Sequence, residues 1–301
     1  MHILKIGLHK SGNFWLHTIL HNIIEHSGLE YKSFIQNQPI YELAKTWDLN
    51  QFPGQIKNNC LDITKNTAFY RISNIFRYPV DDMDDYINSS TLVWSHSQMS
   101  SNALSIMQKF DKVIYIIRDP RDVSISWSNF VFTYYVRRYY PFLTVDETDS
   151  ETYLNNNLTT IISDWMNHVG GYLKHQKDLN IHFVFYERLL DNFDRELEKI
   201  LEYLEIDLDE KAKGEIQEKV SFNYMKKDSQ NHLIKGKLGQ WAEILTDAQK
   251  EKVLEITTPL LKLLSYPVNN QIDSLPELPE KLPENINLPD GKVVLMKPSN
   301  H

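Results

Sequence analysis

The run at residues 112–117 (KVIYII) constrains the fold of this chain most strongly. Apart from its first lysine, every side chain in the run is apolar or aromatic, so a strand made from it offers no polar face to water. Strands covered on both faces are typical of parallel sheets packed between two layers of helices. Shorter β-prone runs occur at residues 2–8 (HILKIGL), 91–95 (TLVWS) and 181–186 (IHFVFY).

Helix signals alternate with these strands. Apolar residues follow helical spacing over residues 14–24 and again over 193–204. Asp119 followed by Pro120 is typical of a helix start, because aspartate caps the free amides and proline fits the first turn. The alternation predicts an α/β fold with a central, mostly parallel sheet flanked by helices.

The end of the chain differs in character from the rest. A capping box at residues 246–249 (TDAQ) precedes a last periodic helix, which predicts a single domain over residues 1–268. Residues 269–301 are acidic and repeatedly interrupted by proline, which cannot continue a helix or an inner strand. We therefore expect an extended C-terminal tail there.

Composition excludes several classes of protein. Of 301 residues, 42% are hydrophobic and 24% are charged, which is typical of a globular protein and not of a collagen or a disordered chain. A net charge of −8 argues against a nucleic-acid partner but allows a local site for a small anion. Cys60 is the only cysteine, which fits a reducing compartment. With no leader segment and no apolar run of about 18 residues, we expect a cytoplasmic protein without a membrane partner.

The loop after the first strand has the spacing of a phosphate-binding loop. Gly7 and Gly12 fit the pattern G-x-x-x-x-G-K-[ST], but Asn13 and Phe14 stand where lysine and a hydroxyl residue would follow. Because phenylalanine cannot bind magnesium, the pattern predicts a phosphate site without a metal, built from Lys10 and the amides of a helix N-terminus. The alternative interpretation is an ordinary strand-to-helix turn that uses Gly12 for its conformational freedom.

Several motifs, in order along the chain, resemble those of the cytosolic-type sulfotransferases. Residues 9–15 (HKSGNFW) are similar to the family's Lys-Ser-Gly-Thr-Thr-Trp loop, and residues 118–130 (RDPRDVSISWSNF) are similar to its 3′-phosphate motif. The resemblance spans roughly residues 3–265. Further matches are Tyr186-Glu187, Ser221-Phe222 and Lys235-Gly236.

The resemblance implies the P-loop-like fold of that family and an enzyme that uses 3′-phosphoadenosine 5′-phosphosulfate (PAPS) as co-substrate. It also implies that adenosine 3′,5′-bisphosphate (PAP) is the product and that no metal is needed. The residues that it assigns to nucleotide binding are Lys10, Ser11, Gly12, Asn13, Phe14, Trp15, Arg118, Ser126, Tyr186, Ser221, Phe222, Lys235 and Gly236.

Two catalytic residues follow from the same resemblance. Lys10 occupies the place of the lysine that contacts the bridging oxygen as the bond to sulfur breaks. His96, after Ser95, occupies the place of the base that takes the proton of the acceptor, a role that suits a neutral imidazole. His9, next to Lys10, is the second choice for the base.

The sequence departs from the family pattern at several positions. Asn13 and Phe14 replace two threonines, Trp94 replaces a lysine ahead of Ser95-His96, and Ile234 replaces an arginine. Each lost net hydrogen bond weakens binding by about 1 kcal/mol. We expect a nucleotide site that is weakened and not abolished.

The acceptor is expected to be a small molecule with a hydroxyl or an amine. The regions that bind the acceptor in the family are acidic and aromatic here, and carboxylates and aromatic faces both attract cations. We hypothesise a cationic natural product with an amine or guanidine group. The residues concerned are Asp81, Asp82, Asp84, Asp85, Tyr134, Tyr135, Tyr139, Tyr140 and Phe142.

Two alternatives stay open. The strand-loop-helix start also fits a nucleotide-dependent small-molecule kinase, which would bind ATP with magnesium. Asn13, Phe14 and Ile234 also fit a catalytically inactive nucleotide-binding protein on the same fold. The family's dimer signature is only partly present over residues 242–251, so no oligomeric state is assigned.

Overall fold

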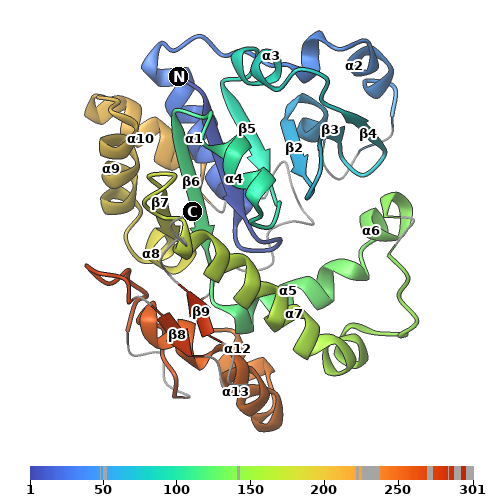
Figure 1. Ribbon diagram of the computed structural model, residues 1–301, viewed down its shortest axis with the longest axis vertical. Helices are drawn as coiled ribbons and strands as arrows, with labels where there is room; N and C mark the ends of the chain where they lie inside the picture. Colours follow the sequence, from blue (N-terminus) through green and yellow to red (C-terminus); the bar gives the residue numbers. More distant parts are fainter. Residues whose placement is uncertain are drawn as a thin grey trace.

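A seven-stranded sheet runs through the molecule in the order β4-β3-β2-β5-β1-β6-β7 (Figure 1). The computed structural model describes all residues except 48, 50–52, 141–142, 222–223, 226–237, 270–273, 284, 288–292 and 296–301. The strands are β1 (Ile3–Gly7), β2 (Asn59–Ile63), β3 (Ala68–Ile72), β4 (Phe76–Pro79), β5 (Leu92–Ser95), β6 (Lys112–Ile117) and β7 (His182–Phe185).

The sheet is mostly parallel, as the apolar character of β6 predicts. Strands β2, β5, β1, β6 and β7 pair in parallel, whereas β3 and β4 add an antiparallel edge. The chain leaves β1 toward one side of the sheet and returns through β5 to β6 on the other side. The carboxyl ends of β5, β1 and β6 are therefore neighbours at the point where the strand order reverses, which is where open α/β sheets bind ligands.

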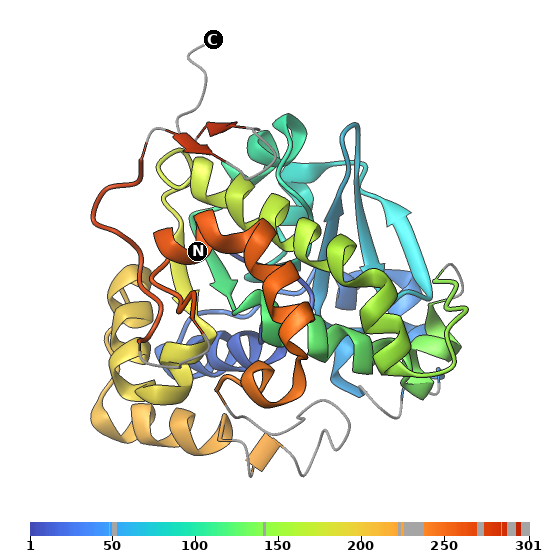
Figure 2. The same cartoon turned by 90° about the horizontal axis from the view of Figure 1, so that it is seen from below.

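Helices cover both faces of the sheet. Alternate residues of β6 face the two layers: Val113, Tyr115 and Ile117 pack with α4, α7 and α13, and Ile114 and Ile116 pack with α1, α9 and α10. Figure 2 shows α7 and α13 side by side over one face. These helices are α1 (Asn13–Ser27), α4 (Ser101–Met107), α7 (Ser150–Lys174), α9 (Phe193–Leu204), α10 (Glu210–Lys219) and α13 (Asp247–Leu263).

Shorter elements complete the structure. They are α2 (Pro39–Ala44), α3 (Met83–Asn88), α5 (Pro120–Val131), α6 (Tyr134–Tyr139), α8 (Tyr186–Asp191), α12 (Trp241–Ile244), the 3₁₀ helices η1 (Ile35–Asn37) and η2 (Pro53–Lys57), and a separate two-stranded sheet of β8 (Asn285–Asn287) and β9 (Val293–Leu295).

The helix starts predicted from capping residues are confirmed. The Asp119 side chain accepts a hydrogen bond from the Arg121 amide, and Pro120 is the first residue of α5. Thr246 and Gln249 form the reciprocal capping box at the start of α13. Because α5 begins directly after β6, Arg118 and Asp122 lie at the ligand-binding edge of the sheet.

Part of the proline-containing tail lies against the body. Arg188 Nη1 donates to Pro276 O at 3.0 Å, and the Glu277 amide donates to Leu264 O at 2.8 Å. Leu278 and Leu282 pack against the main core cluster. These contacts hold the described part of residues 274–283 close to α8 and to the end of α13.

Candidate functional site

A cavity of about 560 Å³ lies at the carboxyl ends of β5, β1 and β6. Most of the residues assigned to the site from the sequence line it, and they come from segments far apart in the chain. Ser11 is an exception, since it is buried and its amide donates to Leu8 O at 3.2 Å. Phe222, Lys235 and Gly236 lie outside the described residues. The lining includes Lys10, Gly12, Asn13, Phe14, Trp15, His96, Arg118, Ser126, Tyr186 and Ser221.

The loop between β1 and α1 makes a tight turn into this cavity. Lys10 has a φ of 68° and Gly12 a φ of 95°, both in the left-handed region. A Cβ on Gly12 would lie 2.4 Å from Cδ2 of Tyr186, so only glycine allows the loop to approach this ring. The turn brings the N-terminus of the 15-residue helix α1, the positive end of its dipole, to the cavity.

Lys10 and Arg118 form a cationic centre at this turn. Arg118 Nη1 donates to the Lys10 carbonyl at 3.2 Å, and Lys10 Nζ lies 4.1 Å from the centre of the Phe130 ring. Burial, together with the charge of Arg118, lowers the pKa of Lys10 to about 8. Within the described part of the chain, no carboxylate forms an ion pair with Lys10. This half-buried ammonium group therefore favours an external anion as its partner.

Arg118 is held on several sides. Its guanidinium carbon lies 4.4 Å from the centre of the Tyr186 ring, and Nη2 lies 3.8 Å from Asp122 Oδ2. Nε is buried and has no hydrogen-bond partner among the described residues. Burial raises the pKa of Asp122 to about 6, despite the nearby charge of Arg118. Arg118 and Asp122 therefore do not form a close hydrogen-bonded ion pair, and Arg118 keeps N–H donors for a ligand.

The side chain of Asn13 is engaged within the protein. Its Oδ1 accepts from Lys5 Nζ at 3.1 Å, and its Nδ2 donates to Leu8 O at 2.6 Å. Lys5 Nζ also donates to the Asn13 carbonyl at 3.1 Å. The side-chain amide of Asn13 therefore stabilises the loop from within the protein, and Asn13 is 5% exposed.

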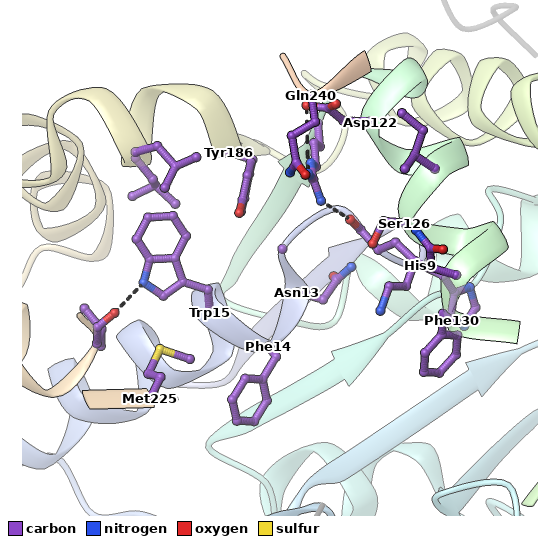
Figure 3. Close-up of a pocket in the computed structure, with 18 of the residues that line it drawn as sticks. His9, Asn13, Phe14, Trp15, Asp122, Ser126, Phe130, Tyr186, Met225 and Gln240 are labelled. Carbon is purple, nitrogen blue, oxygen red and sulfur yellow. Dashed lines mark hydrogen bonds and ion pairs between the residues drawn. The ribbon is translucent and has the colours of Figure 1, made fainter. Parts of the chain in front are cut away.

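Aromatic and apolar residues form one end of the cavity. Trp15 meets Tyr186 edge to face, with ring centres 5.6 Å apart, and Trp15 Nε1 donates to Val220 O at 2.9 Å. Figure 3 shows Trp15 and Met225 at one end of the pocket, and His9 and Phe130 at the other. Aromatic side chains at the end of a cavity suit a flat heteroaromatic ring.

Two histidines stack at the opposite end. The rings of His9 and His96 lie with centres 3.9 Å apart at an angle of 25°. His96 Nδ1 is 2.6 Å from Gly7 O, and Trp94 Nε1 donates to His96 Nε2 at 2.9 Å. His168 on α7 lies 3.2 Å from the His96 carbonyl and so fixes the backbone at this position.

The aspartates predicted to meet the acceptor lie elsewhere. Asp82 caps α3 by accepting from the amides of Asp84 and Asp85, and Asp84 pairs with Lys109 at 2.7 Å. Because α3 precedes β5, it leads into the amino end of that strand, and none of these aspartates lines the cavity. The carboxylates of the cationic-acceptor hypothesis are therefore absent from the described lining near the two histidines.

The match to known proteins fits this geometry. A family model described as "Sulfotransferase domain" matches residues 1–265. The chain belongs to the sulfotransferase family. The loop, the β6–α5 junction and the His96 segment of this sulfotransferase are the regions that suggested the resemblance from sequence.

Curated relatives of this sulfotransferase align over part of their length. Sulfotransferase 1A1 of Mus musculus is 29% identical over 178 residues, which cover 53% of this chain and 59% of that protein. Cytosolic sulfotransferase 1 of Danio rerio is 24% identical over 196 residues, which cover 60% and 63%. The chain thus spans about three fifths of the length of these relatives.

Solved structures share its fold. Mouse sulfotransferase SULT7A1 complexed with PAP matches with a TM-score of 0.52 and 19% identity, over 83% of this chain and 80% of that chain. Retinol dehydratase in a complex with retinol and PAP matches with a TM-score of 0.54 and 16% identity, over 84% and 79%. At these identities, the likeness establishes the fold of the sulfotransferase and not its ligands.

The described residues lack two kinds of feature. No cluster of three or more His, Cys, Asp or Glu side chains is arranged there to hold a metal ion. In the same part of the sulfotransferase, no helix combines the length and the apolar character that crossing a bilayer requires.

Sequence reasoning missed Lys5 as a residue of the site. It lies on β1, is fully buried, and reaches the loop from below. The available signal was a lysine in the middle of an otherwise apolar strand directly before a phosphate-binding loop. A buried lysine needs a hydrogen-bonding partner nearby, and the loop is the nearest polar segment.

Proposed function

We propose that this sulfotransferase transfers the sulfuryl group of PAPS to a hydroxyl or an amine of a small molecule. The observation that carries the proposal is the joint placement of Lys10 and Arg118 at the N-terminus of α1, with no described carboxylate paired to Lys10. A half-buried cation next to the N-terminus of a helix favours an anionic ligand.

The proposed pose places the two phosphate ends of the nucleotide on different elements. Lys10 and the first amides of α1 would hold the 5′-phosphosulfate, and Arg118 with Ser126 on α5 would hold the 3′-phosphate. The adenine would lie in the slot of Trp15 and Tyr186. The names of the relatives, and the PAP bound in the two structural neighbours, support this assignment.

The chemistry makes modest demands on the protein. The acceptor oxygen or nitrogen forms a bond to sulfur, the bond from sulfur to the 5′-phosphate oxygen breaks, and its electron pair stays on the phosphate. Lys10 would stabilise the charge that develops on this oxygen, as cations do in phosphoryl transfer. The acceptor proton must pass to a base, for which the sequence offers His96 first and His9 second. We propose that no metal takes part, since Phe14 stands where a magnesium ligand would be.

The cavity supports an uncharged acceptor better than a cationic one. The end near the histidines is lined by Trp94, Phe130, Tyr135 and Tyr140, and by no described carboxylate. The charge of Lys10 would repel a second cation. We propose a planar acceptor such as a phenol, held by aromatic faces.

The test is transfer of radioactive sulfate. The protein is incubated with ³⁵S-labelled PAPS and a panel of phenols in EDTA, and labelled sulfate esters are separated by chromatography. We expect labelled ester without added metal. Tight PAP binding without ester would indicate an inactive nucleotide-binding protein, and transfer of phosphate from ATP with magnesium would indicate a kinase; either result contradicts the proposal.

We also propose a cytoplasmic location. The single cysteine, Cys60, is a buried free thiol, which fits a reducing compartment. The name of the Danio rerio relative supports the same location.

A further inference from the structure

Both nitrogens of His96 are already engaged. Nδ1 lies 2.6 Å from the Gly7 carbonyl, and Nε2 lies 2.9 Å from Trp94 Nε1. A carbonyl oxygen only accepts a hydrogen bond and an indole N–H only donates one, so Nδ1 carries the proton and Nε2 uses its lone pair on Trp94. The lone pair that a base would offer to an acceptor is therefore occupied.

Trp94 is held in this position by its neighbour on β1. Lys5 and Trp94 are directly paired in the parallel register of β1 and β5, and Lys5 Nζ lies 3.4 Å from the centre of the indole ring. Lys5 is itself fixed by its two hydrogen bonds to Asn13. Turning the indole away from His96 would lose the buried contact between the Lys5 amino group and the indole ring, so the Trp94–His96 hydrogen bond is stable.

The ring nitrogens of His9, unlike those of His96, are available to an acceptor. Its ring lines the same cavity and stacks on His96 with ring centres 3.9 Å apart. No group in the described part of the chain hydrogen-bonds either nitrogen of the His9 ring. Burial, and then the charges of nearby basic side chains, lowers the pKa of His9 to about 3, so the ring is neutral at pH 7. A bound polyanionic donor would raise this pKa again.

We propose that His9, and not His96, takes the proton of the acceptor. This inference rests on the proposed function. As the acceptor oxygen bonds to sulfur, its proton passes to a lone pair on the His9 ring, and the electron pair of the broken sulfur–oxygen bond leaves with the 5′-phosphate. His96 is then a positioning residue: it stacks on the base and is itself anchored by Gly7 and Trp94.

The experiment compares His9→Gln with His96→Gln on two phenols of similar size, 4-methylphenol and the far more acidic 4-nitrophenol, with PAPS as donor. Loss of a general base costs about 100-fold or more in kcat. We expect His9→Gln to show that loss with 4-methylphenol and a much smaller one with 4-nitrophenol, whose proton leaves without help. Glutamine at position 96 can still donate to Gly7 and accept from Trp94, so His96→Gln should slow both phenols by the same small factor.

The dependence on acceptor acidity separates a base from a structural residue, because a distorted pocket would slow both phenols alike. PAP affinity, measured by calorimetry, should stay unchanged in both variants and so shows that they fold. The assignment is overturned if the loss of kcat depends more on the acidity of the phenol in His96→Gln than in His9→Gln, or does not depend on it in His9→Gln. In either case, sulfate transfer by the wild type leaves the proposed function intact. Failure of the wild-type protein to transfer sulfate would overturn the proposed function and this assignment with it.

Discussion

At the scale of single residues, the site depends on two lysines, Lys10 and Lys5, neither of which forms an ion pair with a described carboxylate. Lys10 rests on the Phe130 ring and faces the cavity, while Lys5 lies beneath the loop and bonds to Asn13. The two lysines therefore have different tasks, one toward a ligand and one toward the loop. Substitutions at the two positions should change different quantities.

Lys10 should give the reaction a basic pH limit. Because burial and Arg118 lower the pKa of Lys10 to about 8, the free enzyme loses this charge as the pH rises through that value. We expect kcat/KM for PAPS to fall above about pH 8 in the wild type. Lys10→Arg should remove this fall, because a guanidinium stays charged. Lys10→Met should be about 100-fold slower than the wild type below pH 8, and this difference should shrink at higher pH as the wild type loses the Lys10 charge. A wild-type profile that is level from pH 7 to beyond pH 9, measured by sulfate transfer, would contradict this role.

Lys5→Met should loosen the loop. The substitution removes the donor to two buried oxygens of Asn13, and such unpaired groups destabilise a protein by about 1–3 kcal/mol each. We expect a lower midpoint of urea unfolding and PAP binding about tenfold weaker by calorimetry. Lys109→Met is the matched control, since Lys109 forms an exposed ion pair with Asp84. Equal PAP affinity in Lys5→Met and the control would show that Lys5 does not brace the loop.

At the scale of elements, three strand ends and the helices that follow them determine the site. The β1–α1 turn and the β6–α5 junction could be predicted because their residues act locally: glycine opens a turn and aspartate caps a helix. Edge strands β3 and β4 were not predicted, although each pairs with the strand next to it in the chain, because both are short and β4 is mostly exposed, so it has little apolar pattern. The aspartates of the Asp81–Asp85 segment do not line the cavity; Asp82 caps α3, and the sequence does not separate the two roles because capping and acceptor binding use the same residue type.

Two glycines provide a matched test of the β1–α1 turn. Gly12 and Gly28 flank α1 and both have positive φ angles, 95° and 72°. A Cβ on Gly12 would meet Tyr186, whereas a Cβ on Gly28 would meet nothing within 4 Å. Alanine at either position should lower the unfolding free energy by about 1–2 kcal/mol through backbone strain. Only Gly12→Ala should also weaken PAP binding, and equal binding by the two variants would contradict the close packing of loop and ring.

At the scale of the whole molecule, buried carboxyl groups link the site to the C-terminal part of the body. Glu187 accepts from the Asp119 amide at 2.8 Å and from the Tyr266 hydroxyl at 2.9 Å. Trp241, which follows the undescribed residues 226–237, donates its amide to Asp122 at 3.0 Å. Segments distant in sequence therefore meet at the start of α5, next to Arg118. A single sequence has no local pattern that predicts such contacts.

Glu187 should make stability depend on pH. Burial raises its pKa to about 7, above the usual 4.5, so the folded state holds a proton that the unfolded chain releases. The stability that the protonated Glu187 side chain contributes is fully present below about pH 4.5 and is lost as the pH rises through about 7. Glu187→Gln mimics the protonated form and should raise the unfolding free energy at pH 8 by up to about 3 kcal/mol. Urea unfolding at pH 5 and pH 8 measures the unfolding free energy of both proteins. An equal difference between variant and wild type at the two pH values would contradict the prediction.

In the proposed function, one pocket binds both phosphate ends of an adenosine nucleotide without a metal. Calorimetric titration of the wild-type protein with PAP, adenosine 5′-monophosphate and ATP, with magnesium and with EDTA, tests it most directly. Since charge-assisted hydrogen bonds contribute about 1.5–3 kcal/mol each, PAP should bind at least tenfold more tightly than the monophosphate, equally in magnesium and in EDTA. Tightest binding of ATP in the presence of magnesium, or equal binding of PAP and the monophosphate, would contradict the claim.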